Sequence, residues 1–109
     1  SASKAALLSL TQSAALELAP YDINVNAIHP GEIWTPMWER IARQGGLSSE
    51  SREGSSLKEK FDFVVQKRTP LGRPQTPEDI GNMAAFLASN AARNITGQSI
   101  NVDGGGFMS

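Results

Sequence analysis

The first nineteen residues constrain the fold of this chain most, because they predict a helix that needs cover on more than one side. No glycine or proline interrupts them, and Pro20 marks the expected end of the helix. Apolar residues surround nearly the whole circumference, and Lys4 and Glu17 are the only charged residues in the segment. We therefore expect two or more faces of this helix to be covered, in part by another subunit.

Two short strands are predicted. Residues 23–28 alternate at first and then become apolar, and Pro30 and Gly31 follow directly. This pattern indicates a buried strand that ends at a sharp turn, which is where an open α/β sheet binds its ligand. Farther along, Ile100 and Val102 alternate with polar neighbours and predict the second strand.

Residues 36–68, between these strands, are expected to form a flap. A short helix is predicted over 36–44, and the next residues, 46–56, are mostly polar. A second amphipathic helix is then expected before Pro70, because four apolar residues recur at helical spacing: Leu57, Phe61, Val64 and Val65.

Another helix is predicted to start at Pro77, since Thr76 is a favourable N-cap and Asp79 follows in the first turn. The order of helices and strands is that of a right-handed α/β crossover in a parallel sheet. Two strands cannot cover three apolar helices, and so small a chain without cross-links has little core to spare. We expect the chain to be an incomplete domain.

Composition excludes several classes of function. Ten Lys and Arg against eleven Asp and Glu leave a net charge of −1, so no basic stripe for nucleic acid is expected. No apolar run reaches the roughly 18 residues of a membrane span. The absence of cysteine excludes disulfides and thiolate zinc sites, and cytoplasmic location is expected. His29, the sole histidine, is interpreted as structural, and no metal site is predicted.

Six motifs together resemble the carboxy-terminal part of a short-chain dehydrogenase/reductase. In the family's order and spacing they are Ser1-Ala2-Ser3-Lys4-Ala5-Ala6, Ile23 through Gly31, Thr35, Pro70-Leu71-Gly72-Arg73, Pro77-Glu78-Asp79-Ile80, and Thr96-Gly97-Gln98 through Gly105. The resemblance implies that residues 1–109 are the carboxy-terminal portion of one doubly wound, parallel-sheet, Rossmann-like domain, which is incomplete without upstream sequence.

The resemblance assigns a catalytic role to Lys4, which matches the lysine of the family's Tyr-x-x-x-Lys motif. The tyrosine would fall one residue before Ser1, so the chain looks processed or cut at its start. Lys4 would lower the pKa of that tyrosine and hydrogen-bond the ribose of NAD or NADP. The glycine-rich phosphate loop, the residue that selects NAD or NADP and the catalytic serine would also lie upstream, so the isolated chain is expected to be inactive.

The segment after the first strand is expected to hold the nicotinamide. By resemblance, the cofactor-binding residues there are Pro30, Gly31, Ile33 and Thr35. Three neighbouring apolar residues line the substrate site or, as an equal alternative, pack the flap onto the body: Trp34, Met37 and Trp38. In the first strand, Asn26 is expected to anchor a neighbouring loop through its amide.

The implied activity is hydride transfer between a nicotinamide cofactor and a secondary alcohol or its ketone. The sequences at 35–38 and 102–109 are similar to family members that act on small diols and polyols. The expected partners are the upstream half of the same enzyme and further copies, as a homotetramer or homodimer. The alternative is a non-catalytic interaction or structural fragment of dehydrogenase fold.

Overall fold

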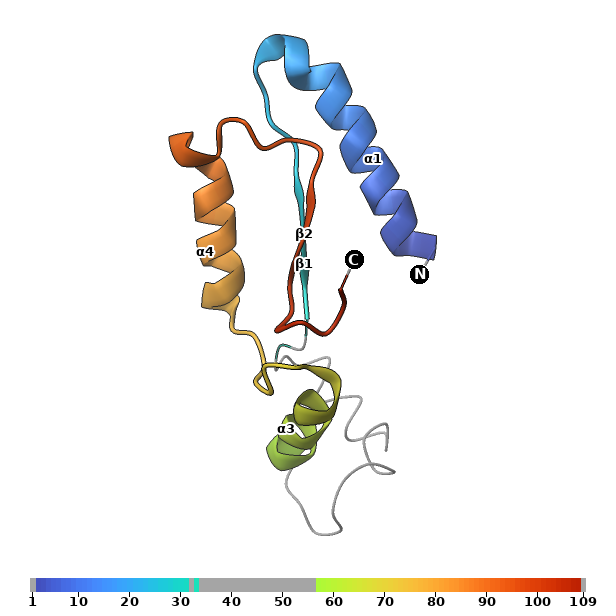
Figure 1. Cartoon of the computed structure of the whole chain (residues 1–109), viewed down its shortest axis with the longest axis vertical. Helices are drawn as coiled ribbons and strands as arrows, with labels where there is room; N and C mark the ends of the chain where they lie inside the picture. Colours follow the sequence, from blue (N-terminus) through green and yellow to red (C-terminus); the bar gives the residue numbers. More distant parts are fainter. Residues whose placement is uncertain (1, 32, 34–56, 109) are drawn as a thin grey trace. The chain divides into compact units, whose positions relative to one another are not determined.

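The structure is a computed structural model that describes residues 2–31, 33 and 57–108. It divides into two compact units, treated separately below. The first unit comprises Ser1–His29 and Glu78–Asn101, and the second comprises Pro30–Pro77 and Val102–Ser109. The elements, labelled in Figure 1, are α1 (Ala2–Leu18), the short 3-10 helix η1 (Ala19–Tyr21), β1 (Ala27–Pro30), α3 (Leu57–Arg68), α4 (Pro77–Ala88), the 3-10 helix η3 (Asn90–Ala92) and β2 (Ser99–Val102).

The first predicted helix, α1, ends at Leu18, and Pro20 lies in the 3-10 turn that follows it. Asp22 closes this turn in the left-handed region at φ 59°, and its N–H donates to the Ala19 carbonyl at 2.9 Å.

Little of the apolar surface of α1 is covered by the described chain. Thr11 and Ala15 are its buried residues, whereas Leu10 is 66% exposed and Leu16 is 79% exposed. The expectation that several faces are covered therefore stays a prediction, and the cover would have to come from another chain or segment.

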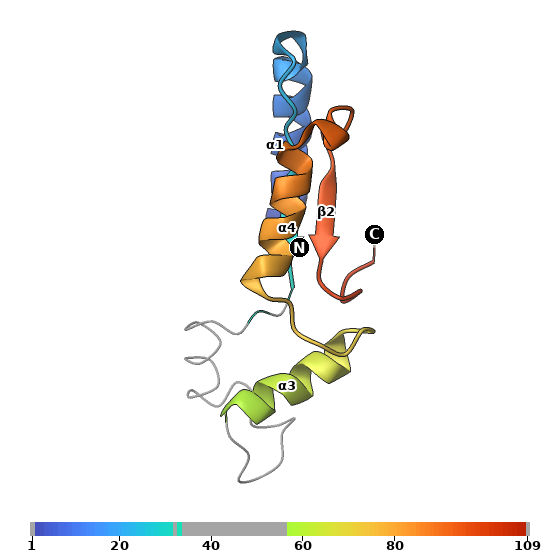
Figure 2. The ribbon, with the colours of Figure 1, turned by 90° about the vertical axis from the view of Figure 1, so that its left-hand side faces the viewer.

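The two strands pair in parallel, as predicted. The Ala27 N–H donates to the Gln98 carbonyl at 2.9 Å, and four residues later the Gly31 N–H donates to the Val102 carbonyl at 3.2 Å. Because both partners advance in the same direction, the strands are parallel. Figures 1 and 2 show α1 and α4 on opposite sides of this pair. The first unit thus has the layered α/β arrangement predicted for a doubly wound sheet.

The first strand begins later than the sequence predicted, at Ala27 instead of residue 23. The reason is that only part of the ladder continues before Ala27: the Gly97 N–H donates to the Val25 carbonyl at 2.7 Å, but side chains take the neighbouring places. The Val25 N–H donates to Thr96 Oγ1 at 2.9 Å, and Asn26 Nδ2 donates to the Ile95 carbonyl at 2.9 Å. The Gln98 N–H donates to Asn26 Oδ1 at 3.0 Å. These bonds confirm the predicted role of Asn26 as an anchor for the neighbouring loop.

The other two helices form where the sequence predicted them. In α3, Phe61, Val64 and Val65 are at most 1% exposed and form the core of the second unit. In α4, which begins at Pro77, the apolar residues Ile80 and Met83 are half-buried.

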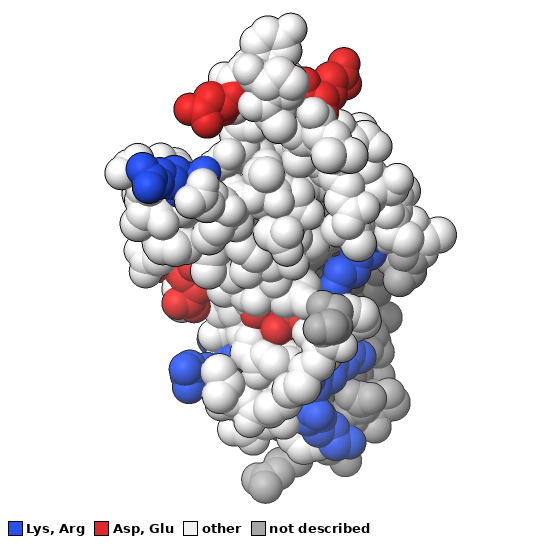
Figure 3. All heavy atoms as spheres, turned by 45° about the horizontal axis from the view of Figure 1, so that its top comes forward, with Lys and Arg blue, Asp and Glu red and all other residues white. Residues whose placement is uncertain are grey.

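Residues 36–56, which include the predicted short helix and the polar stretch of the flap, lie outside the described residues. The flap over 36–68 therefore stays a prediction, with α3 as its described part. Among the described helices, none is both long and apolar enough to span a membrane. Figure 3 shows acidic and basic side chains scattered over a mostly uncharged surface.

Candidate functional site

Lys4 is held at the end of the sheet where the strands terminate. It lies in the first turns of α1 and is half-buried, and its Nζ donates to Oδ1 of Asn101 at 3.1 Å. Asn101 is the penultimate residue of β2. The ammonium is thus held at the carboxyl end of a parallel strand, which is the end where open α/β sheets bind ligands.

Gly31, in the second unit, directly follows β1 and must be a glycine for reasons of packing. A Cβ built on it would lie 2.7 Å from the Cβ and 2.9 Å from the Cα of Asp103, and would also meet the side chain of Gln75. Such contacts are too short for any side chain. Gly31 was predicted as a cofactor-binding residue, and the structure adds a close approach of its backbone to the turn after β2.

That turn is organised by Asp103, a residue to which the sequence analysis assigned no role of its own. Its Oδ1 accepts the Gly105 N–H and its Oδ2 accepts the Phe107 N–H, each at 3.0 Å. Gly104 and Gly105 have φ values of 64° and 88°, which favour glycine. The carboxylate therefore fixes the backbone that packs against Gly31. A carboxylate followed by glycines was the signal from which this could have been found.

Gln75 is a second residue that the sequence did not single out. It is 6% exposed, and its Nε2 donates to the Arg73 carbonyl at 3.2 Å. Its Oε1 is buried and has no hydrogen-bond partner among the described residues. No periodicity or motif marks a lone glutamine in a loop, so sequence analysis had no signal for it.

His29, in β1, is half-buried, and its Nε2 is buried without a hydrogen-bond partner among the described residues. The described part of the chain contains no group of three or more His, Cys, Asp or Glu residues that could hold a metal ion.

The remaining predicted site residues are only partly described. Pro30 ends β1, and Ile33 is half-buried. Both belong with Gly31 to the second unit, whereas Lys4 belongs to the first. Four predicted residues lie outside the described ranges: Thr35, Trp34, Met37 and Trp38.

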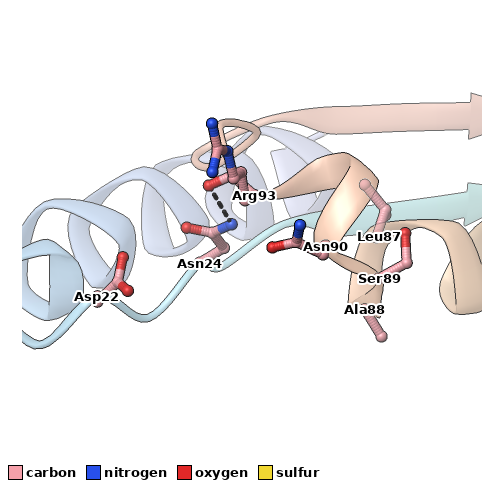
Figure 4. A pocket seen from close by; sticks show the side chains of 7 residues that line it. All are labelled: Asp22, Asn24, Leu87, Ala88, Ser89, Asn90 and Arg93. Atoms are coloured by element: carbon pink, nitrogen blue, oxygen red, sulfur yellow. Dashed lines mark hydrogen bonds between the residues drawn. The ribbon is translucent and has the colours of Figure 1, made fainter.

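A polar cavity of about 410 Å³ opens in the first unit, on the side where β1 begins. Figure 4 shows its lining, in which Asn24 Nδ2 donates to the Arg93 carbonyl at 2.9 Å. The cavity is lined by Asp22, Asn24, Leu87, Ala88, Ser89, Asn90 and Arg93. Lys4, the predicted catalytic residue in this unit, is not among the described residues that line the cavity.

Comparison with known proteins gives the family. A family model described as enoyl-(acyl carrier protein) reductase matches residues 1–106. Galactitol 2-dehydrogenase of Agrobacterium fabrum is 44% identical to this chain over 112 residues, which cover 99% of this chain and 40% of that protein. The chain thus spans about two fifths of the length of this curated relative.

Solved structures agree with the observed fold. A short chain dehydrogenase family protein from Francisella tularensis is 32% identical, with a TM-score of 0.77 over 94% of this chain and 40% of that one. L-sorbose reductase from Gluconobacter frateurii, complexed with NADPH and L-sorbose, is 32% identical, with a TM-score of 0.81 over 97% of this chain and 39% of that one. The predicted Rossmann-like α/β class is thereby confirmed, and the chain belongs to the short-chain dehydrogenase/reductase family.

Proposed function

We propose that this chain is part of an oxidoreductase that transfers a hydride between NAD or NADP and a secondary alcohol or its ketone. The observation that carries the proposal is the place of Lys4, the residue that matches the family's catalytic lysine, at the carboxyl end of β2 beside Asn101. The family match over residues 1–106 supports it.

The substrate that we propose is a small polyol or diol. Two similar proteins are named for galactitol and L-sorbose, a polyol and a ketose. One neighbour holds NADPH in its solved structure, which supports a nicotinamide cofactor here. The proposal covers both NAD and NADP, because the residue that would distinguish them would, by the family resemblance, lie in upstream sequence.

The residues of this chain fit such a cofactor. Gly31 is exposed, so part of its backbone is accessible to a ligand, while the direction of its absent Cβ is occupied by Gln75 and Asp103. We propose that Pro30, Gly31, Ile33 and Thr35 hold the nicotinamide ring. The bound dinucleotide would supply the hydride acceptor or donor, and the protein would orient it and exclude water.

Lys4 would tune the proton transfer that accompanies hydride transfer. A phenol titrates near pH 10, about 3 units above neutrality, and a nearby ammonium favours the phenolate. We propose that Lys4 lowers the pKa of an upstream tyrosine in this way and also donates a hydrogen bond to the cofactor ribose. The tyrosine would take the proton from the substrate hydroxyl during oxidation and return it during reduction.

Trp34, Met37 and Trp38 are the substrate contacts in this proposal. Trp34 lies in the sequence between Ile33 and Thr35, and Met37 and Trp38 follow these residues. Their apolar side chains would exclude water from the reacting carbon. The flap over 36–68 would carry two of them.

The proposed activity requires sequence upstream of this chain. The sheet of the described residues has two strands, the chain covers 40% of galactitol 2-dehydrogenase, and Leu10 and Leu16 expose most of their surface. We propose that the upstream half supplies the phosphate loop, the tyrosine and the serine, and that the complete enzyme is a cytoplasmic homotetramer or homodimer.

The experiment is to purify the complete protein and this chain alone, and to follow reduction of NAD and NADP with galactitol, sorbitol and butane-2,3-diol. The complete protein is expected to reduce one dinucleotide with at least one of these alcohols, and the isolated chain is expected to reduce neither. Failure of the complete protein to bind either dinucleotide would refute the proposal.

The alternative is a non-catalytic fragment whose helix α1 mediates association, and the exposure of Leu7, Leu10 and Leu16 favours it. Intact mass and gel analysis of the purified material separates the two functions. A companion chain of upstream sequence favours the enzyme, whereas a self-associating chain without a companion favours the fragment.

A further inference from the structure

The side chain of Gln75 lies between two glycines that follow the two strands. A Cβ built on Gly31, after β1, would meet Gln75 Oε1, and a Cβ built on Gly104, after β2, would lie 3.0 Å from Gln75 Nε2. The carboxamide therefore occupies the space that two missing Cβ atoms leave open. All three residues belong to the second unit, so the contact is internal to it.

The polarity of this side chain is not explained by packing alone. Its Nε2 donates to the Arg73 carbonyl, but its Oε1 is buried without a partner among the described residues. A buried carbonyl without a donor lowers stability, and an apolar side chain of equal length would fill the same space without that cost.

An amide side chain can be held in one orientation by a hydrogen bond, whereas an apolar side chain cannot. The bond from Nε2 to the Arg73 carbonyl, at 3.2 Å, fixes the plane of the carboxamide. Methionine fills similar space but has no directional partner, so it adapts to its surroundings instead of fixing them. The amide thus sets where the backbone of Gly31 can lie.

We propose that Gln75 is a positioning residue for the nicotinamide-binding segment. Its carboxamide holds the Gly31 backbone against the turn at Gly104, and this sets the path of the chain at Pro30 and Gly31. The proposal rests on the proposed function, because it assigns that segment to the cofactor. Gln75 itself contacts no reacting atom in this account.

The test compares Gln75→Met with Gln98→Met in the complete enzyme. Gln98 is a matched control, because its Nε2 also donates to the carbonyl two residues before it, that of Thr96, at 3.2 Å. Gln98 is exposed and lies in the first unit. Both variants therefore lose the same local hydrogen bond, but only one of them lies against Gly31.

Gln75→Met is expected to raise KM for the dinucleotide about tenfold, which corresponds to about 1.4 kcal/mol, with kcat little changed. Its denaturant midpoint should equal or exceed that of Gln98→Met, because the unpaired buried carbonyl is removed. Gln98→Met should leave KM unchanged. Amide hydrogen exchange at Gly31, whose N–H donates to the Val102 carbonyl, should become faster in Gln75→Met alone.

An unchanged KM for the dinucleotide in Gln75→Met would overturn the proposal. A lower denaturant midpoint together with equal losses in dinucleotide affinity and in kcat would also overturn it, because that is the result expected for a purely structural residue. These outcomes differ from failure of the proposed function, in which the unsubstituted enzyme itself binds no dinucleotide. The exchange rate of the Gly31 amide needs no cofactor, so an unchanged rate would overturn the positioning step in either case.

Discussion

Replacing Gly31 by alanine should distinguish the packing role of this glycine from general effects of removing a glycine. The new Cβ would lie 2.7 Å from the Cβ and 2.9 Å from the Cα of Asp103. Asp103 cannot move away freely, because its carboxylate accepts the N–H groups of Gly105 and Phe107 and its carbonyl accepts that of Gly106. One strand end or the other must shift.

The magnitude follows from this geometry. Forcing a methyl group into a well-packed site costs about 1 to 3 kcal/mol, and contacts below 3.0 Å on backbone favour the upper part of that range. Gly81 is the matched control, since it lies exposed in α4 and a Cβ there would meet nothing within 4 Å. Gly81→Ala should stabilise the protein by about 0.5 to 1 kcal/mol, because alanine is the better helix former.

The assay is denaturant unfolding of both variants of the complete enzyme, together with dinucleotide binding. The free energies of unfolding should differ between the two variants by about 2 to 4 kcal/mol, with Gly31→Ala the less stable. Gly31→Ala should also weaken dinucleotide binding, whereas Gly81→Ala should not. Equal stability of the two variants would refute the reasoning, because Gly31 would then have room for a side chain.

Three further predictions concern other residues. Lys4→Ala should lower turnover by about two orders of magnitude or more and shift the pH profile of the rate to alkaline values, because the tyrosine loses the charge that lowers its pKa. Lys4→Arg should restore only part of the rate. An unchanged pH profile in Lys4→Ala would refute the proposed effect of Lys4 on the tyrosine. Asp103→Ala should lower the free energy of unfolding by about 2 kcal/mol, because two charge-assisted hydrogen bonds are lost. The control Asp62→Ala removes an exposed ion pair with Lys58 at 3.1 Å and should lower it by about 0.5 kcal/mol. Equal losses for the two variants in urea unfolding would refute the role of Asp103 in organising the turn. Proteolysis within residues 46–56 should slow when cofactor and a substrate analogue saturate the complete enzyme, and equal cleavage rates would remove the main support for a closing flap.

The sequence predicted the regular elements well because their signals are local. The spacing of Phe61, Val64 and Val65 predicted α3, and Thr76 with Pro77 predicted the start of α4. The predicted start of β1 is four residues too early, because the ladder there is partly replaced by bonds that involve the side chains of Thr96 and Asn26, whose partners lie about 70 residues away in the chain.

The candidate site was predicted less completely, and the reason is again the range of the interactions. Lys4 was found through the motif around it, but its bond to Asn101 spans 97 residues and leaves no local pattern. Gln75 and Asp103 limit the space around Gly31, and this arrangement depends on how the carboxyl ends of two parallel strands come together. No periodicity in a single segment records such a contact.

The central claim, hydride transfer in an enzyme that contains this chain, is tested most directly by isotope transfer. The complete enzyme is incubated with oxidised dinucleotide and a secondary alcohol deuterated at the carbinol carbon, and the reduced cofactor is analysed by mass spectrometry and NMR. The account predicts that the deuterium appears on the nicotinamide ring, that Lys4→Ala transfers it far more slowly, and that the isolated chain transfers none. Deuterium that is released to water, or alcohol oxidation without any label on the nicotinamide, would contradict the account.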